Sequence, residues 1–132
     1  MERGRGGQQR AVERQHRHHR LDGTGTRQND EVEVRVLRAV FGDRLPRIPV
    51  SSTKAQLGHC LGAAGAVEAV VTVLALDRSL VPATPTLREP DPGWSDLDLV
   101  PTAGRRQPLE VALSSSYGFG GHNVTLVLGR GV

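Results

Sequence analysis

Residues 51–77 read SSTKAQLGHCLGAAGAVEAVVTVLALD, a polar start followed by a long apolar run. The apolar residues predict a helix from Gly58 or His59 to about Asp77. Its first half, residues 62–66, carries almost no side-chain volume, although each interior glycine costs about 1 kcal/mol relative to alanine. We therefore expect another part of the protein to approach this backbone closely. The second half is apolar nearly all round, which predicts a helix central to its fold.

Three polar residues in this stretch are candidates for chemistry. Lys54 is the only lysine among the 17 lysine and arginine residues of the chain. His59 lies at the expected helix start, where the helix dipole disfavours a protonated imidazole. Glu68 is an acid on an otherwise apolar helix and needs a partner, either Lys54 or an ion. Each also has an alternative interpretation when taken singly. Lys54 could be a surface lysine, His59 a capping or core histidine, and Glu68 a residue at the partly exposed end of the apolar face.

The preceding segment predicts a loop and a second helix. Residues 21–30, LDGTGTRQND, form the loop, and Asp30 is placed to cap the helix. Glu33, three residues later, completes a variant of the capping box. Valines at helical spacing continue to Phe41, and Gly42 is expected to end the helix.

The remaining segments are assigned from their composition. Residues 48–52, IPVSS, predict a buried strand in which Pro49 lies where no ladder donor is needed. Residues 53–58 are expected to form a loop. Residues 79–108 hold six of the eight prolines and predict an extended surface excursion. Two further strands are predicted at residues 110–116 and 124–128, joined by a glycine-rich turn at residues 117–123.

The basic surplus of the chain is confined to its first 20 residues. They hold six arginines and two glutamates, whereas the other residues carry 11 basic and 12 acidic side chains. Residues 1–20 contain little that can be buried, so we expect a disordered leader. Its His16, His18 and His19 are more typical of a solvated tail than of a metal site. Nucleic-acid binding would rest on this leader alone.

Composition sets further bounds on the protein. The chain has 132 residues, enough for one domain, and no apolar run reaches the length of a membrane helix. It contains a single cysteine, Cys60, which excludes an internal disulfide and fits the cytoplasm.

Taken together, the motifs identify a family. DGTGTRQND (22–30), SSTKAQLGHCLGAAGAVEA (51–69) and SSSYGFGGHN (114–123) occur in that order. They resemble the C-terminal part of β-ketoacyl-acyl carrier protein synthases, nearest to the synthase II type. The resemblance covers residues 21–130. It implies the C-terminal half of an α/β, thiolase-like fold, with a mixed sheet and a buried Ala/Gly-rich helix after the leader.

The resemblance also implies a reaction and the residues for it. The family condenses an acyl thioester held on a cysteine with malonyl-acyl carrier protein, which loses carbon dioxide, in fatty-acid or polyketide synthesis. His59 matches the histidine that stabilises the enolate, and Lys54 matches a lysine whose charge network includes Glu68. Substrate-binding positions are matched by Thr24, Thr26, Phe119, Gly118 and Gly120. Phe119 matches a gating residue, and its glycine neighbours would let the loop move. The resemblance implies that acyl carrier protein is a partner and that the protein forms a homodimer. It implies no metal and no tightly bound cofactor, because the substrate is carried on the phosphopantetheine of acyl carrier protein.

Two positions depart from the family pattern. The nucleophilic cysteine of the family lies in a half that this chain lacks, and Cys60 is expected to be a buried apolar residue instead. Asp22 stands where the family carries a second catalytic histidine. A carboxylate cannot donate to an enolate oxygen, and loss of one such donor costs about 3–4 kcal/mol.

These departures predict a synthase fragment that is inactive alone. A truncated gene or a frameshift just upstream of codon 23 would produce the abrupt change in composition. A non-catalytic partner subunit of a condensing enzyme is the alternative, followed by nucleic-acid binding through the leader.

Overall fold

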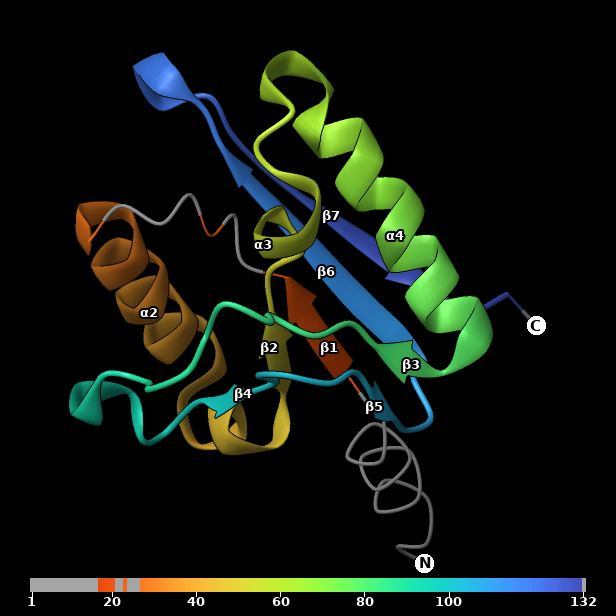
Figure 1. Ribbon diagram of the computed structural model, residues 1–132, viewed down its shortest axis with the longest axis horizontal. Helices are drawn as coiled ribbons and strands as arrows, with labels where there is room; N and C mark the ends of the chain where they lie inside the picture. Colours follow the sequence, from red (N-terminus) through yellow and green to blue (C-terminus); the bar gives the residue numbers. More distant parts are fainter. Residues whose placement is uncertain (1–16, 21–22, 24–26, 132) are drawn as a thin grey trace, which may run out of the picture.

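The computed structural model describes residues 17–20, 23 and 27–131 (Figure 1). The helices are α2 (Arg27–Phe41), α3 (Lys54–Leu57) and α4 (Ala64–Arg78). The strands are β1 (Arg17–Arg20), β2 (Pro49–Ser51), β3 (Leu80–Val81), β4 (Asp98–Leu99), β5 (Arg105–Arg106), β6 (Val111–Tyr117) and β7 (Asn123–Gly129). Short 3-10 helices lie at Gly42–Arg47, Leu61–Ala63, Pro92–Trp94 and Phe119–Gly121.

Five strands form a mixed sheet in the order β4-β2-β1-β6-β7. The first four are parallel, and β7 runs antiparallel to β6. Strands β3 and β5 make a separate antiparallel pair. The carboxyl ends of β1, β2, β4 and β6 therefore meet at one edge of the sheet, and the loops that follow these strands lie there.

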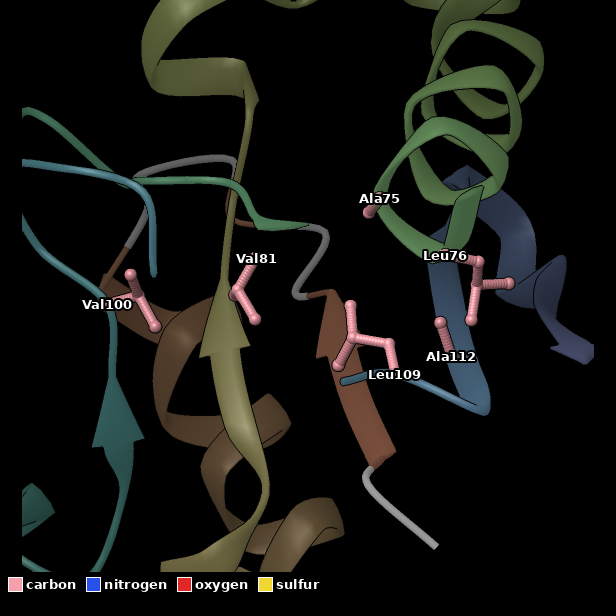
Figure 2. Packing of buried hydrophobic residues seen from close by; sticks show 6 residues of the cluster. All are labelled: Ala75, Leu76, Val81, Val100, Leu109 and Ala112. Atoms are coloured by element: carbon pink, nitrogen blue, oxygen red, sulfur yellow. The ribbon is translucent and has the colours of Figure 1, made fainter. Parts of the chain in front are cut away.

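Helices α2 and α4 cover opposite faces of this sheet. Val50 of β2 packs in one cluster with Val34 and Leu37 of α2. Ala112 of β6 packs in a second cluster with Leu76 of α4, as Figure 2 shows. Val50 is in register with Leu113 through β1, and successive strand residues point to opposite faces. The two clusters are thus separate cores on the two sides of the sheet.

The predicted leader extends too far. Residues 17–20 form β1, which lies between β2 and β6 in the middle of the sheet. Disorder through residue 20 is therefore wrong for these four residues, while residues 1–16, including His16, lie outside the described part of the chain. Composition did not predict this strand, because β1 is held by backbone hydrogen bonds to β2 and β6, which do not require apolar side chains in β1.

Several helix boundaries also differ from the sequence prediction. Helix α2 begins at Arg27, so Asp30 lies in its first turn rather than at its cap. The predicted loop 53–58 contains the single turn of α3. The long helix begins at Ala64 instead of Gly58 or His59.

Residues 79–108 are more than a surface excursion. They contain β3, β4 and β5, and they contribute Val81 and Val100 to one core and Leu97 to the other. The strand predictions hold better, because β2 is buried throughout, Pro49 is its first residue, and β6 and β7 flank a glycine-rich turn.

One face of α4 packs on the sheet and the other faces outward. Glu68, Thr72, Ala75 and Leu76 are buried, whereas the large apolar side chains Val70, Val73 and Leu74 are exposed. A Cβ on Gly65 would lie 3.6 Å from Ser116 Oγ, and one on Gly62 would meet nothing within 4 Å. A separation of 3.6 Å is ordinary van der Waals contact, so the close approach predicted at these two glycines is wrong. Among the described residues no helix is long and apolar enough to cross a membrane.

Candidate active site at the carboxyl edge of the sheet

The sheet topology gathers the three sequence motifs at one edge. Gly23 follows β1, Lys54 and His59 follow β2, and Phe119 follows β6. These three strands are adjacent and parallel, so their carboxyl ends are neighbours (Figure 1). In open α/β sheets, ligand sites form outside the carboxyl ends of the strands. Segments far apart in sequence therefore lie at the same edge of the sheet.

Lys54 and Glu68 form a buried ion pair. Lys54 Nζ lies 2.5 Å from Glu68 Oε1, and their side chains are 7% and 4% exposed. The backbone positions the lysine: Leu57 donates to the Thr53 carbonyl, and Gly58 donates to that of Lys54. Gly58 ends this turn at φ +75°, a conformation that favours glycine. The partnership proposed for Glu68 from the sequence is confirmed, and it spans α3 and α4.

His59 is exposed and lies in the loop between α3 and α4. Its Nδ1 accepts a hydrogen bond of 3.0 Å from the Leu61 backbone N–H, at the start of a 3-10 helix. A neutral imidazole that accepts at Nδ1 carries its proton on Nε2. This ring is therefore oriented to donate from Nε2, although it caps a 3-10 turn rather than starting α4.

Lys54 and His59 both line a cavity of about 370 Å³. Its other walls come from α2, β2, β4 and the loops around residues 84–94. The lining residues are Gly23, Asp30, Val34, Val50, Ser51, Ser52, Ala55, Thr84, Thr86, Leu87, Trp94 and Leu99. The volume falls within the range of small-molecule sites, and most of the wall is apolar with a few polar groups.

A carboxylate that the sequence reasoning treated as a helix cap also supports this site. Glu33 is 1% exposed, and its Oε2 accepts hydrogen bonds from the Gly23 backbone N–H at 3.1 Å and from Asn29 Nδ2 at 2.9 Å. Glu33 thus ties α2 to the loop after β1. The sequence shows the three-residue spacing between Asp30 and Glu33, but it does not show that Glu33 accepts a hydrogen bond from Gly23, ten residues earlier. Burial raises the pKa of the Asp30 carboxyl, with the Asn29 hydrogen bond opposing the shift.

An exposed ion pair joins α2 to the segment that carries Trp94. Arg38 of α2 donates to both carboxylate oxygens of Asp96, at 2.7 and 2.6 Å, and also to the Gly93 carbonyl. Hydrogen bonding by Arg38 lowers the pKa of Asp96, and the same contact raises that of Arg38.

The remaining predicted residues are not gathered at the cavity. Phe119 is fully exposed in the 3-10 turn between β6 and β7, where Gly120 has φ +79°. Neither Phe119 nor its neighbours Gly118 and Gly120 line the cavity. Asp22, Thr24 and Thr26 lie outside the described residues.

Cys60 differs from its prediction. It is a free, exposed thiol that precedes the Leu61–Ala63 turn, so the expectation of a buried residue inside a helix is wrong. The reason is the later start of α4. Within the described part of the chain, no three His, Cys, Asp or Glu side chains gather as metal ligands do.

Comparison with known proteins identifies the relatives of this chain. Residues 8–88 match the family described as Beta-ketoacyl synthase, C-terminal domain. The chain is 50% identical over 104 residues to the 3-oxoacyl-[acyl-carrier-protein] synthase 2 of Synechocystis sp. (strain ATCC 27184 / PCC 6803 / Kazusa), covering 79% of this chain and 25% of the relative. It is 47% identical over 108 residues to the synthase 2 of Coxiella burnetii (strain RSA 493 / Nine Mile phase I), covering 82% and 26%.

A solved structure supports the same relationship. The ketosynthase of a type II polyketide synthase, in complex with its acyl-carrier protein and bound to the hexaketide, is similar with a TM-score of 0.78 and 34% identity. The match covers 87% of this chain and 28% of that one. The thiolase-like fold expected from the motifs is confirmed, and the chain spans about a quarter of the length of the curated relatives it matches. The match begins at residue 8, inside the predicted leader, and the chain belongs to the β-ketoacyl synthase C-terminal domain family.

Proposed function

We propose that this chain supplies the enolate-stabilising part of a decarboxylating condensation between an acyl thioester and a malonyl thioester. The observation that carries the proposal is His59, whose Nδ1 accepts from Leu61, which leaves the proton on Nε2, and which lines the same cavity as Lys54. A hydrogen-bond donor preorganised toward a developing oxyanion is the main requirement of such a step.

The reaction proceeds in two steps. The bond between the malonyl carboxylate and its α-carbon breaks, carbon dioxide leaves, and the electron pair forms an enolate whose oxygen accepts from His59 Nε2. The α-carbon then attacks the acyl thioester carbonyl, forms the new carbon–carbon bond and expels a cysteine thiolate. The proposal places that cysteine outside residues 1–132. Cys60, which lies on the same loop as His59, has no such role in it.

Other residues act around this step. Lys54 and Glu68 hold the loop that carries His59, and Thr24 and Thr26 contact the phosphopantetheine arm of acyl carrier protein. Phe119 gates the approach, with Gly118 and Gly120 allowing its loop to move. Asp22 opposes the reaction, because its negative charge repels an enolate. The proposed assembly is a homodimer that receives its substrates from acyl carrier protein in the cytoplasm.

The test is complementation. The chain is mixed with the nucleophile-bearing remainder of a 3-oxoacyl synthase, and carbon dioxide release from malonyl-acyl carrier protein is followed. We expect no activity from the chain alone and measurable activity from the mixture. His59→Ala should lower the rate about 100- to 1,000-fold, and Asp22→His should raise it by a similar factor.

His122 provides the matched control. It is also an exposed histidine, lies in the turn before β7, and does not line the cavity. His122→Ala should leave the rate within about twofold. Equal rates for the His59 and His122 variants would contradict the proposal.

A non-catalytic partner subunit is the second candidate. It is favoured by the exposed apolar side chains of α4 and β7, which suit a covering polypeptide. In that case the chain would bind an intact ketosynthase, and neither His59→Ala nor Asp22→His would alter the rate of the complex.

A further inference from the structure

Strand β7 has one open edge. It is the last strand in the sheet order, and within the described part of the chain it pairs with β6 alone. Its sequence NVTLVLG holds no charge and no proline, and its large apolar side chain Val127 is 67% exposed. An edge strand with these features can accept a further strand, because it presents a row of outward N–H and C=O groups.

Two hydrogen bonds show which residues of β7 face the open edge. At one end of the β6–β7 ladder the Arg130 N–H donates to the Glu110 carbonyl, and at the other end the Gly118 N–H donates to the His122 carbonyl. Hydrogen-bonded pairs alternate along an antiparallel ladder, so the even-numbered residues of β7 bond to β6. The odd-numbered residues direct their N–H and C=O groups outward. They are Asn123, Thr125, Val127 and Gly129.

This outward pattern is complementary to itself. When two β7 strands lie antiparallel with Leu126 opposite Leu126, each outward residue meets another: Thr125 faces Val127, and Asn123 faces Gly129. These are then the hydrogen-bonded pairs of the new ladder. A shift in either direction leaves residues at the strand ends unpaired, so only this register pairs the whole strand. Because β7 carries no charge, the side chains that meet across the contact do not repel one another.

We propose that two copies of this chain pair antiparallel through β7, about a twofold axis at Leu126. The contact is isologous, so it closes with two copies and joins their five-stranded sheets into one. Leu126 lies on the same face of the strand as Leu128, which packs against the α4 core, so the two Leu126 side chains meet on that face. The inference does not rest on the proposed condensation, because it needs neither a thioester nor a catalytic residue.

Cysteine cross-linking tests the register of this contact. The full-length chain carries Cys60→Ser, which removes the exposed native thiol, together with Leu126→Cys. It is oxidised with diamide, and the disulfide-linked dimer is measured by non-reducing electrophoresis. Opposite residues of a non-hydrogen-bonded antiparallel pair have Cα atoms about 4.5 Å apart, which a disulfide can span. We expect most of the chain to become covalent dimer.

The matched control is Val124→Cys in the same Cys60→Ser background. Val124 is also an exposed apolar residue on the same face of β7, but the proposed register places it opposite Leu128 of the other copy. The two Val124 positions are then separated by four residues along the strands, about 13 Å, which is too far for a disulfide. Its cross-linking should be lower than that of Leu126→Cys by about 10-fold or more.

A proline substitution tests the backbone contact. Val127→Pro removes an outward N–H and no hydrogen bond to β6, so an edge strand tolerates it. We expect this variant to be a monomer by size-exclusion chromatography with light scattering, and circular dichroism verifies that it is folded. Val127→Ala keeps the N–H and should still dimerise.

Three results would overturn the proposal. They are equal cross-linking of the Leu126 and Val124 variants, the absence of cross-linking in both, and a dimer that persists in Val127→Pro but is lost in Val70→Lys, which would place the contact on α4. None of these measurements follows carbon dioxide release. Failure of the complementation assay therefore leaves the β7 contact standing, and failure of the contact leaves that assay standing.

Discussion

The Lys54–Glu68 ion pair places two charged side chains in the protein interior. Both side chains are almost fully buried, and the pair joins the α3 turn to the packed face of α4. Removal of one partner leaves an uncompensated buried charge, which destabilises proteins by about 3–5 kcal/mol. We therefore expect Glu68→Ala to lower the free energy of unfolding by about that amount, measured by urea denaturation.

The double variant separates charge from packing. Lys54→Met with Glu68→Leu replaces both charges by apolar groups of similar size, which is often neutral in buried pairs. It should recover most of the stability lost in Glu68→Ala. A double variant as unstable as the single one would show that the pair contributes through more than its charges.

At the scale of elements, the Arg38–Asp96 contact joins α2 to the segment that carries Trp94. Arg38 lowers the pKa of Asp96 below its usual value of 3.8. Because the folded-state pKa is depressed, the contact stabilises the fold above the unfolded pKa. That contribution is lost as pH falls through the folded-state pKa.

The expected consequence is a pH-dependent unfolding midpoint. The difference in urea unfolding midpoint between the parent chain and the Asp96→Asn variant should be largest at about pH 6 and vanish at about pH 2. Urea titrations at both pH values measure it. Both groups are solvent-exposed, so the effect should be small and should shrink further at high salt. A difference that persists undiminished at the lower pH would assign the stabilisation to packing instead of charge.

Strand β1 joins the β4-β2 pair to the β6-β7 pair in the middle of the sheet. It pairs with β2 on one side and β6 on the other, in register with Val50 and Leu113 at His19. His19→Pro removes a backbone donor from the middle of the sheet, so we expect loss of the cooperative thermal transition.

The control for β1 is His19→Val, which changes the same side chain but keeps the N–H and favours a strand. Circular dichroism melting should show a cooperative transition for this variant. Similar melting of the two variants would mean that β1 contributes little to stability. Deletion of residues 1–20 would remove β1 together with the arginines, so it could not test nucleic-acid binding by the leader alone.

At the scale of the molecule, the side formed by α4 and the edge strand β7 exposes several large apolar side chains. Val70 and Val73 of α4 are exposed, as are Leu126 and Val127 of β7. Strand β7 is the edge of the sheet, and its sequence NVTLVLG contains no charge and no proline that would prevent pairing with another chain. Figure 1 shows β7 beside α4 at this side of the molecule.

We expect this surface to make the isolated chain self-associate. Size-exclusion chromatography with light scattering should show a mass that rises with concentration. Val127→Lys places a charge on the edge strand and should lower that mass without changing the thermal midpoint by more than a few degrees. Arg44→Lys, at an exposed position remote from β7, is the control. A concentration-independent monomer would contradict the expectation.

Several elements of the fold, one buried ion pair and the family were predictable from the sequence. Spacing and composition placed α2, β2, β6 and β7, because each follows from local periodicity and from turn residues such as Gly42. The isolation of Glu68 on an apolar helix predicted its buried partner correctly, since an unpaired acid could not remain there. The motifs around Lys54, His59 and Phe119 identified the family.

Other features were decided only by the tertiary structure. The Arg- and His-rich residues 17–20 form a central strand, because ladder bonds from β2 and β6 outweigh their poor local propensity. The late start of α4 exposes Cys60 and frees His59 Nδ1 to accept from Leu61. The sequence by itself determined the family and the candidate residues Lys54, His59 and Glu68. Only the parallel order of β2, β1 and β6 decided that their loops meet at one edge, because strand pairing joins segments that local sequence does not relate.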